Sequence, residues 1–200
     1  MANWRTVVEL PLNEWSPAPV TLLSRLLGPF NLKMGGSDDR APVRPLWHWA
    51  VAEARSPDWY ATCGIADSLP GRFDALTLVL ATVMLRMERE PALIGRSSLL
   101  AELFVEDMDG QLRQAGVGDL VVGKRIGKLM GALGGRITAL REAFATDEAA
   151  GETALAEVAR RNATLSEHGD VAKIAARLRA LARRLDGVSG EQLLAGNVPA

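Results

Sequence analysis

The chain has 200 residues, with 23 basic and 24 acidic side chains, one cysteine and two histidines, a length that suits one domain with tails. A single cysteine cannot form an intramolecular disulfide, and Cys63, His48 and His168 are too few for a zinc-finger or cluster site. The nearly balanced charge argues against a protein that coats nucleic acid over its whole surface, although local basic faces stay open.

The N-terminal part of the chain shows no targeting pattern. Residues 1–10 are interrupted by charges, and Glu9 and Glu14 do not suit a basic transit peptide. The longest apolar stretch, 75–85, is short, because a bilayer core needs about 20 apolar residues in a helix. We therefore expect a chain that does not cross a membrane but is free to lie on one.

Residues 1–44 read as an N-terminal lead segment that is partly flexible. They hold five of the ten prolines and a Gly-Gly-Ser-Asp-Asp run at 35–39. From Pro45 onward, apolar residues recur with helical spacing, and no alternating stretch of useful length predicts a strand. The helices are expected at about 45–55, 57–62, 72–89, 97–115, 121–146, 151–165 and 170–186, with a weak one near 190–195.

The predicted helix at 72–89 is apolar around most of its circumference, which is typical of the centre of a bundle. Turn chemistry at 67–71 precedes it, and Pro91 is expected to close it. The pattern as a whole predicts an all-α protein, a compact multi-helix bundle with a less ordered N-terminal lead. We expect the helical domain to span 45–186 and residues 187–200 to form a C-terminal tail.

Two short motifs look like ligand sites, one for a metal ion and one for phosphate. In both cases an ordinary structural interpretation is favoured. Asp107 and Asp109 point about 200° apart on a helix, so they cannot share one metal ion, and Asp109 instead pairs with Arg113. The run Gly116-Val117-Gly118-Asp119 lacks the lysine and the preceding strand of a phosphate loop. It predicts a helix–helix corner in which Gly116 ends one helix in a Schellman motif and Asp119 caps the next.

The segment 123–136 carries glycine at every fourth position, although each interior glycine costs a helix about 1 kcal/mol relative to alanine. These glycines are Gly123, Gly127, Gly131 and Gly135. We favour tight packing against a neighbouring helix of the bundle, and the alternative is a docking groove for an apolar partner helix. A basic face is expected on the far side, formed by Lys124, Arg125, Lys128 and Arg136.

The segment 171–185 has one apolar stripe that basic residues flank on both sides. These residues are Lys173, Arg177, Arg179, Arg183 and Arg184. The pattern suits a helix lying at a membrane surface, where basic side chains reach the head groups. It equally suits a core helix with a solvated basic rim.

No set of residues predicts catalysis. His48 lies between two tryptophans and is expected to be a packed or capping residue, and Cys63 has no neighbouring group that would activate a thiol. The sequence therefore predicts no enzymatic activity, no metal and no cofactor.

Several stretches carry a family resemblance. They are Gly-Arg-Phe-Asp at 71–74, Leu-Phe-Val-Glu-Asp-Met-Asp-Gly-Gln-Leu-Arg-Gln-Ala-Gly-Val-Gly-Asp-Leu at 103–120, Val-Gly-Lys-Arg-Ile-Gly-Lys-Leu-Met at 122–130 and Gly-Arg at 135–136. Together with further matching residues on either side, these stretches cover about 45–165. This region resembles the ubiquinol–cytochrome c chaperone family. The chain departs from the family's pattern in lacking a histidine near 78–80, in Gly123 for the usual proline and in Gly134 for the usual aromatic residue.

The resemblance implies an all-α protein without enzymatic activity that binds newly made cytochrome b and promotes assembly of the ubiquinol–cytochrome c reductase (bc1) complex. It implies cytochrome b as partner, with contacts to the ribosome and the inner-membrane surface, and neither DNA nor a small-molecule substrate. We expect a bacterial protein of the cytoplasm, peripheral at the inner membrane. The candidate partner-binding residues are Arg72, Asp74, Asp107, Asp109, Arg113, Gly116, Gly118, Asp119, Lys124, Arg125, Lys128 and Arg136.

A function from another class also fits the basic helix faces. A ribosome- or RNA-binding helical adaptor would use the residues at 124–136 and 173–184, and its binding would weaken steeply with salt. An unrecognised enzyme is the weakest interpretation, because convergent histidines, cysteines and carboxylates are missing.

Overall fold

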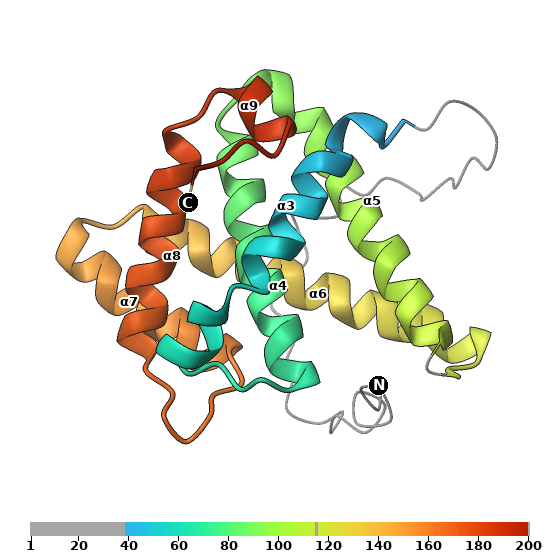
Figure 1. Ribbon diagram of the computed structural model, residues 1–200, viewed down its shortest axis with the longest axis horizontal. Helices are drawn as coiled ribbons and strands as arrows, with labels where there is room; N and C mark the ends of the chain where they lie inside the picture. The colour runs from blue at the N-terminus through green and yellow to red at the C-terminus, as the bar shows by residue number, and fades with distance from the viewer. Residues whose placement is uncertain (1–38, 115, 200) are drawn as a thin grey trace.

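The computed structural model describes residues 39–114 and 116–199, which form a helical bundle (Figure 1). Within these residues there is no strand, and one isolated β-bridge joins Ile65 to Leu165. The elements are η1 (Ala41–Val43), α3 (Arg44–Ala54), η2 (Asp58–Thr62), α4 (Leu69–Glu88), α5 (Pro91–Gln114), α6 (Asp119–Phe144), α7 (Glu148–Asn162), α8 (Val171–Asp186) and α9 (Gly190–Leu194). The all-α prediction is confirmed, and the predicted lead segment lies outside the described residues except for 39–44.

Helix α4 runs through the centre of the bundle and contacts α3, α5, α6 and α8 (Figure 1). Its buried side chains point in nearly every direction, because each direction leads to another helix. Leu78, Leu80 and Val83 all lose their solvent contact completely. The prediction of a central helix in this segment is confirmed.

Several helices begin earlier than the sequence pattern predicts, and α4 and α5 show the physical reason. Helix α4 begins at Leu69, because the hydroxyl of Ser68 accepts a hydrogen bond from the backbone N–H of Gly71 at 3.3 Å. The segment 67–71, expected as a turn, therefore contains a helix cap and a first helical turn. Helix α5 begins at Pro91, since the missing N–H of a proline has no partner in a first turn anyway.

Helices α5 and α6 meet at a tight corner. Gly116 adopts a φ of +80°, its N–H donates to the carbonyl of Arg113 at 2.9 Å, and the N–H of Val117 donates to Leu112 at 3.1 Å. The predicted Schellman motif is therefore confirmed. The predicted cap at Asp119 is wrong: Gly118 holds the N-cap position, and Asp119 is the first residue of α6. Its carboxylate there faces the positive end of the helix dipole.

Both ends of the described chain contribute to the core. Trp47 on α3 is 7% exposed, and its ring meets Phe104 of α5 edge-on with 6.3 Å between the ring centroids. In the segment 187–200, expected as a tail, Val188 and Leu193 are buried. A capping box between Ser189 and Gln192 begins α9, which packs beside α3.

Candidate partner-binding surface

Apart from Arg72 on the outside of α4, the residues singled out from the sequence fall into three places. These are a buried contact between α4 and α6, the exposed N-terminal half of α6 with the corner before it, and α8. The structure brings some of them together in the interior and leaves others facing solvent. The second group and the exposed residues of α8 can meet a partner without rearrangement.

Arg136 was expected on a basic face, and this prediction is wrong because the residue is only 2% exposed. Its guanidinium forms an ion pair with Asp74 of α4 and donates hydrogen bonds to the hydroxyl of Thr77 and to the carbonyl of Asn162, the latter at 2.8 Å. Burial lowers the pKa of Arg136, and the neighbouring Asp74 carboxylate opposes that shift.

Asp74 is buried and satisfied on both of its oxygens. One oxygen pairs with Arg136, and the other accepts hydrogen bonds from the N–H of Thr164 at 2.8 Å and from its hydroxyl at 2.7 Å. The Arg136 guanidinium also lies over the ring of Phe73, 5.5 Å from its centroid. This polar network joins α4, α6 and the segment after α7, so both residues hold the fold together.

The glycines of α6 do not pack inside the bundle, so the interpretation that we favoured from the sequence is wrong. A Cβ atom built on any of them would meet no described atom within 4 Å, and all four positions are exposed. They are Gly123, Gly127, Gly131 and Gly135. The helix buries Leu133, Ile137 and Leu140 on its other side instead. The alternative, a docking groove for an apolar partner helix, is compatible with this placement and stays a prediction.

Basic and apolar side chains accompany the open glycines. Lys124 is exposed, Arg125 and Lys128 are half-buried, and Val121 keeps 45% of its surface in solvent. A large apolar side chain left this exposed is unusual among the described residues, since Ile94 on α5 is the other example. The N-terminal half of α6 therefore presents backbone, cations and one exposed apolar side chain together. We call this surface the α6 face, defined by residues 121, 123, 124, 127, 128, 131 and 135.

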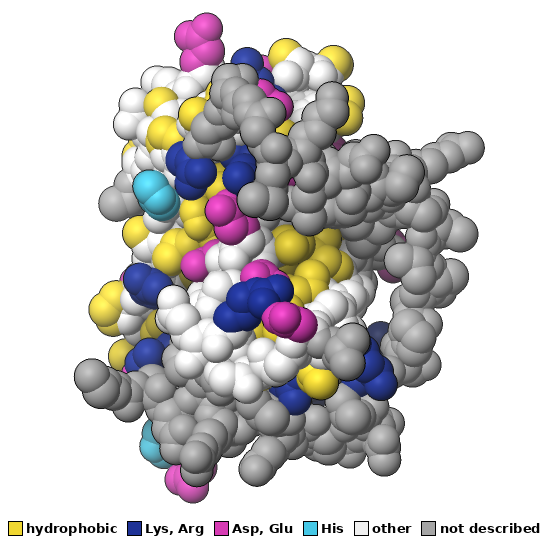
Figure 2. Space-filling model, turned by 90° about the vertical axis from the view of Figure 1, so that its right-hand side faces the viewer, with side chains coloured by type: hydrophobic (Ala, Val, Ile, Leu, Met, Phe, Trp, Pro, Cys, Tyr) yellow, Lys and Arg dark blue, Asp and Glu magenta, His cyan; other side chains and the backbone are white. Residues whose placement is uncertain are grey.

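The acidic residues Asp107 and Asp109 of α5 bind different partners and do not converge on one point. The Asp107 carboxylate accepts a hydrogen bond from Gln111 at 2.8 Å, whereas Asp109 pairs with Arg113 at 2.6 Å. The predicted i,i+4 pair is thus confirmed, and Arg113 also pairs with Asp119 across the corner. Burial raises the pKa of Asp107. Figure 2 looks onto the α5–α6 end and shows both signs of charge intermixed with apolar side chains on its coloured part.

Arg72 lies on the outside of α4, two residues before the buried Asp74. It forms an exposed ion pair with Asp67 at 2.6 Å, and its hydrogen bond lowers the pKa of that carboxyl. Two residues of one short sequence motif therefore have opposite environments, because neighbouring positions of a helix point to different sides.

Helix α8 is a core helix, because its apolar stripe is buried against the bundle. Ile174, Leu178 and Leu185 are completely buried, so the helix has no apolar side left for a bilayer in this structure. None of the described helices is long and apolar enough to cross a membrane. Of the two interpretations of this segment, the core helix with a basic rim is the one observed.

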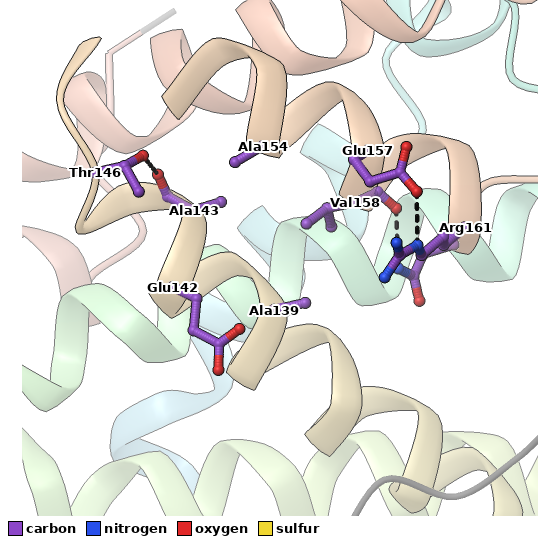
Figure 3. A pocket seen from close by; sticks show the side chains of 9 residues that line it. Ala139, Glu142, Ala143, Thr146, Ala154, Glu157, Val158 and Arg161 are labelled. Carbon is purple, nitrogen blue, oxygen red and sulfur yellow. Dashed lines mark hydrogen bonds and ion pairs between the residues drawn. The ribbon is translucent and has the colours of Figure 1, made fainter. Parts of the chain in front are cut away.

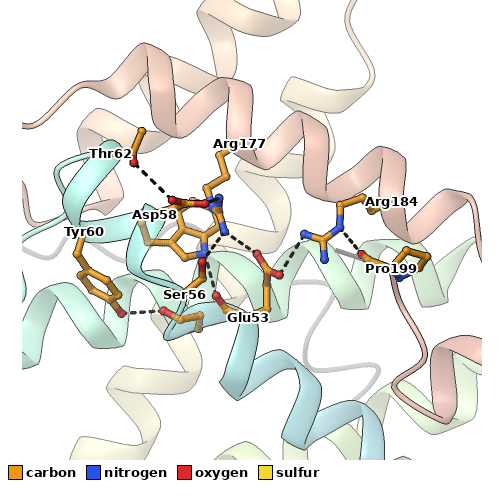
Figure 4. Close-up of polar contacts among 10 residues, drawn as sticks. Glu53, Ser56, Asp58, Tyr60, Thr62, Arg177, Arg184 and Pro199 are labelled. Carbon is orange, nitrogen blue, oxygen red and sulfur yellow. Dashed lines mark hydrogen bonds and ion pairs between the residues drawn. The ribbon is translucent and has the colours of Figure 1, made fainter.

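Part of that basic rim turns inward, as Figure 4 shows. Glu53 of α3, with a side chain 9% exposed, accepts hydrogen bonds from Arg177 and Arg184, each at 3.1 Å. Arg177 also lies over Trp59, 4.7 Å from the ring centroid. These two arginines fasten α8 to α3, so their charges are already compensated.

The remaining basic residues of α8 differ in exposure. Lys173 and Arg183 are exposed, and Lys173 lies 3.8 Å from the Asp170 carboxylate. Arg179 is half-buried, and one of its terminal nitrogens occupies the space that a side chain at Gly151 would need. The rim therefore offers fewer exposed cations than the sequence suggests.

Comparison with known proteins now places this fold. The sequence pattern of the ubiquinol-cytochrome C chaperone family matches residues 61–200, which is well over half of the chain. The chain belongs to the ubiquinol–cytochrome c chaperone family. The match reaches 35 residues beyond the end of the resemblance at about 165, so it includes α8 and α9.

A solved structure supports this membership of the chaperone family. The structure is the crystal structure of the Cbp3 homolog from Brucella abortus, with 31% sequence identity and a TM-score of 0.66. The alignment covers 79% of this chain and 87% of that chain. No curated protein matches the sequence significantly.

Sequence reasoning missed the partners of the buried charges in this chaperone-family chain. Glu53, Thr77 and Thr164 were not singled out, because each is one ordinary polar residue in a helical or loop pattern. The available signal was indirect: Asp74 and Arg136 both lie inside stretches that carry the family resemblance. Their pairing depends on α4 and α6 crossing, which no local pattern encodes.

Proposed function

We propose that this chain is a non-enzymatic assembly chaperone that binds newly made cytochrome b and promotes assembly of the ubiquinol–cytochrome c reductase (bc1) complex. Membership of the ubiquinol-cytochrome C chaperone family carries the proposal, and the similarity to the Cbp3 homolog structure supports it. The proposed work is binding and protection of a client, which needs contact area and no catalytic group.

We assign the client contact to the α6 face. Glycines four residues apart form a row along the helix surface, and small residues in such a row let a second helix approach closely. Cytochrome b is a membrane protein made of apolar helices, so a helix of the client would supply a matching partner. Lys124 and Lys128 beside the row would meet polar groups or anionic lipid at the ends of that helix.

Deletion of the gene tests the function. We expect the levels of bc1 complex and cytochrome b to fall while another respiratory enzyme stays at its normal level. Normal bc1 levels in the deletion strain would overturn the proposal.

Site-specific photo-crosslinking tests the surface. A photoreactive residue at position 127 or 131 is expected to capture cytochrome b in cells, because both positions are open. The matched control is the exposed position 152 on α7, which lies outside the α6 face. Equal capture from 127, 131 and 152 would contradict the assignment.

We further propose that the protein works in the bacterial cytoplasm and reaches the inner membrane as a peripheral protein with its client. The exposed cations of α6 and α8 support this, since each well-placed Lys or Arg near an anionic surface contributes about 1 kcal/mol. Cell fractionation should find the protein in both soluble and membrane fractions, with salt shifting it to the soluble one.

A second candidate is a ribosome- or RNA-binding helical adaptor. The observation that favours it is the absence of any acidic residue between Asp119 and Glu142, which leaves α6 basic on its exposed side. Reversing the charges of Lys124 and Lys128 is expected to abolish salt-sensitive ribosome association if this function holds. Unchanged association would reject it, and Arg136 is left out of the test because it is buried.

A further inference from the structure

A surface pocket of about 260 Å³ lies between the C-terminal part of α6 and α7 (Figure 3). Its apolar floor consists of Ala139, Ala143, Ala154 and Val158. The hollow exists because three of these positions carry alanine where two helices meet, and larger side chains would fill the gap. The volume is below the range of about 300–1,000 Å³ that is typical of small-molecule sites, so the pocket suits a single side chain of a partner.

Among the charged residues that line the pocket, one forms no ion pair with any described residue. Glu157 accepts a hydrogen bond from Arg161 at 2.7 Å, so these two rim charges offset each other, and Arg160 adds a second contact from outside the lining. Glu142 lies at the other end of the pocket and is exposed (Figure 3). No cation of the described residues forms an ion pair with Glu142, so its carboxylate is open to a partner.

We propose that this pocket receives an arginine side chain of a polypeptide partner. The aliphatic part of arginine would cover the floor formed by Ala143, Ala154 and Val158, while its guanidinium would pair with Glu142 at the rim. The side-chain carbonyl of Asn162 provides a second acceptor, because its amide group already donates to Val158 at 2.9 Å. An uncharged side chain would leave Glu142 without a counter-charge, and an acidic one would be repelled.

Arginine fits this rim better than lysine does. Its planar guanidinium presents parallel donors that match a carboxylate with two hydrogen bonds, whereas an ammonium group offers a point charge. Buried arginine anchors in pockets of this kind also contribute strongly to protein–protein binding. The inference rests on the proposed function only for the partner's identity: cytoplasmic loops of membrane proteins are rich in Lys and Arg, so a loop of the client would supply the side chain.

Titration of the full-length, ¹⁵N-labelled protein with the blocked peptide acetyl-Gly-Arg-Gly-amide tests the chemistry by NMR. We expect shift changes at the amides of Ala139, Ala143, Ala154 and Val158, and binding weaker by about fivefold for a peptide with citrulline, which keeps the shape of arginine without its charge. The variant Glu142→Gln should weaken arginine-peptide binding about as much. The matched control Glu152→Gln neutralises an exposed acid of α7 outside the pocket lining, and binding should not change.

Three results would overturn the proposal: no shift changes at these four amides at the highest peptide concentration, equal binding of the citrulline peptide, or equal effects of the two Glu→Gln variants. The bc1 level in the deletion strain reports on the proposed function separately. If the deletion lowers bc1 but the peptide does not bind, the pocket inference fails and the chaperone function stands. If the peptide binds but bc1 is normal, the pocket stands and the client identity fails.

Discussion

Asp74 and Arg136 lie 62 positions apart in the chain and form an ion pair in the interior, where α4 crosses α6. The same guanidinium reaches the carbonyl of Asn162 at the end of α7, and the same carboxylate holds Thr164. A buried pair of this kind gains little over a well-packed apolar pair, because both charges lose their hydration. Removing one partner is costly, since the other charge is then left uncompensated.

The variant Asp74→Ala is therefore expected to lower the free energy of unfolding by about 3–5 kcal/mol, because Arg136 stays buried without a counter-charge. Urea denaturation followed by circular dichroism measures the change. The double variant Asp74→Ala with Arg136→Met should lose less than the sum of the single variants. As a control, Asp67→Ala removes an exposed pair with Arg72 and should change stability by less than about 1 kcal/mol. Equal losses for Asp67 and Asp74 would contradict the structure.

Glu53 is expected to matter more than the exposed acid beside it. Glu53→Gln removes the carboxylate that Arg177 and Arg184 share and leaves Arg177 with the exposed Asp58 alone, so we expect a loss of about 2 kcal/mol in unfolding free energy. Asp58 also pairs with Arg177, but its side chain is 62% exposed, so Asp58→Asn should cost less than about 1 kcal/mol. The same denaturation experiment on both variants checks the order, and a larger effect at position 58 would reject it.

Replacing the open glycines of α6 with alanine is expected to raise the stability of the protein and to weaken its function. Gly131→Ala should raise the free energy of unfolding by about 1 kcal/mol, because alanine is the better helix former and its Cβ meets no described atom within 4 Å. If a client helix contacts this row, the added methyl groups in Gly127→Ala/Gly131→Ala should lower bc1 levels despite greater stability. Gly110→Ala on α5 is the matched control, since its Cβ also meets open space and lies off the α6 face. Normal bc1 levels in the double variant would remove the glycine row from the client contact.

Tyr60 provides a spectroscopic test, because it is the single tyrosine of the chain. Burial raises its pKa above the usual value of about 10, and its hydroxyl donates to the carbonyl of Ala54 at 2.7 Å. Since the folded state holds this proton more tightly, the contribution of Tyr60 to stability is complete below about pH 10 and is lost as pH rises through the folded pKa. The absorbance of tyrosinate at alkaline pH should therefore rise at higher pH in the folded protein than in urea. Coincident titration curves for a protein that stays folded would contradict the burial.

Features that depend on neighbouring residues were predicted well from the sequence. Apolar spacing located every helix from α3 to α9, and Gly116 ended α5 as its left-handed conformation requires. Helix starts at Leu69 and Pro91 were placed too late, because the capping hydroxyl of Ser68 and the tolerance of a first turn for proline were not given enough weight. Such errors concern one or two turns and leave the architecture unchanged.

By itself the sequence determined that this protein is an all-α bundle with family motifs, because periodicity, caps and motifs are written in neighbouring residues. Only the tertiary structure decided which charges face a partner: Arg136, Arg177 and Arg184 are used internally, whereas Lys124 stays exposed. It also decided that the glycines of α6 are open and that a pocket lies beside Glu142. These properties arise where helices distant in sequence cross, and the pattern of one helix does not state what lies against it.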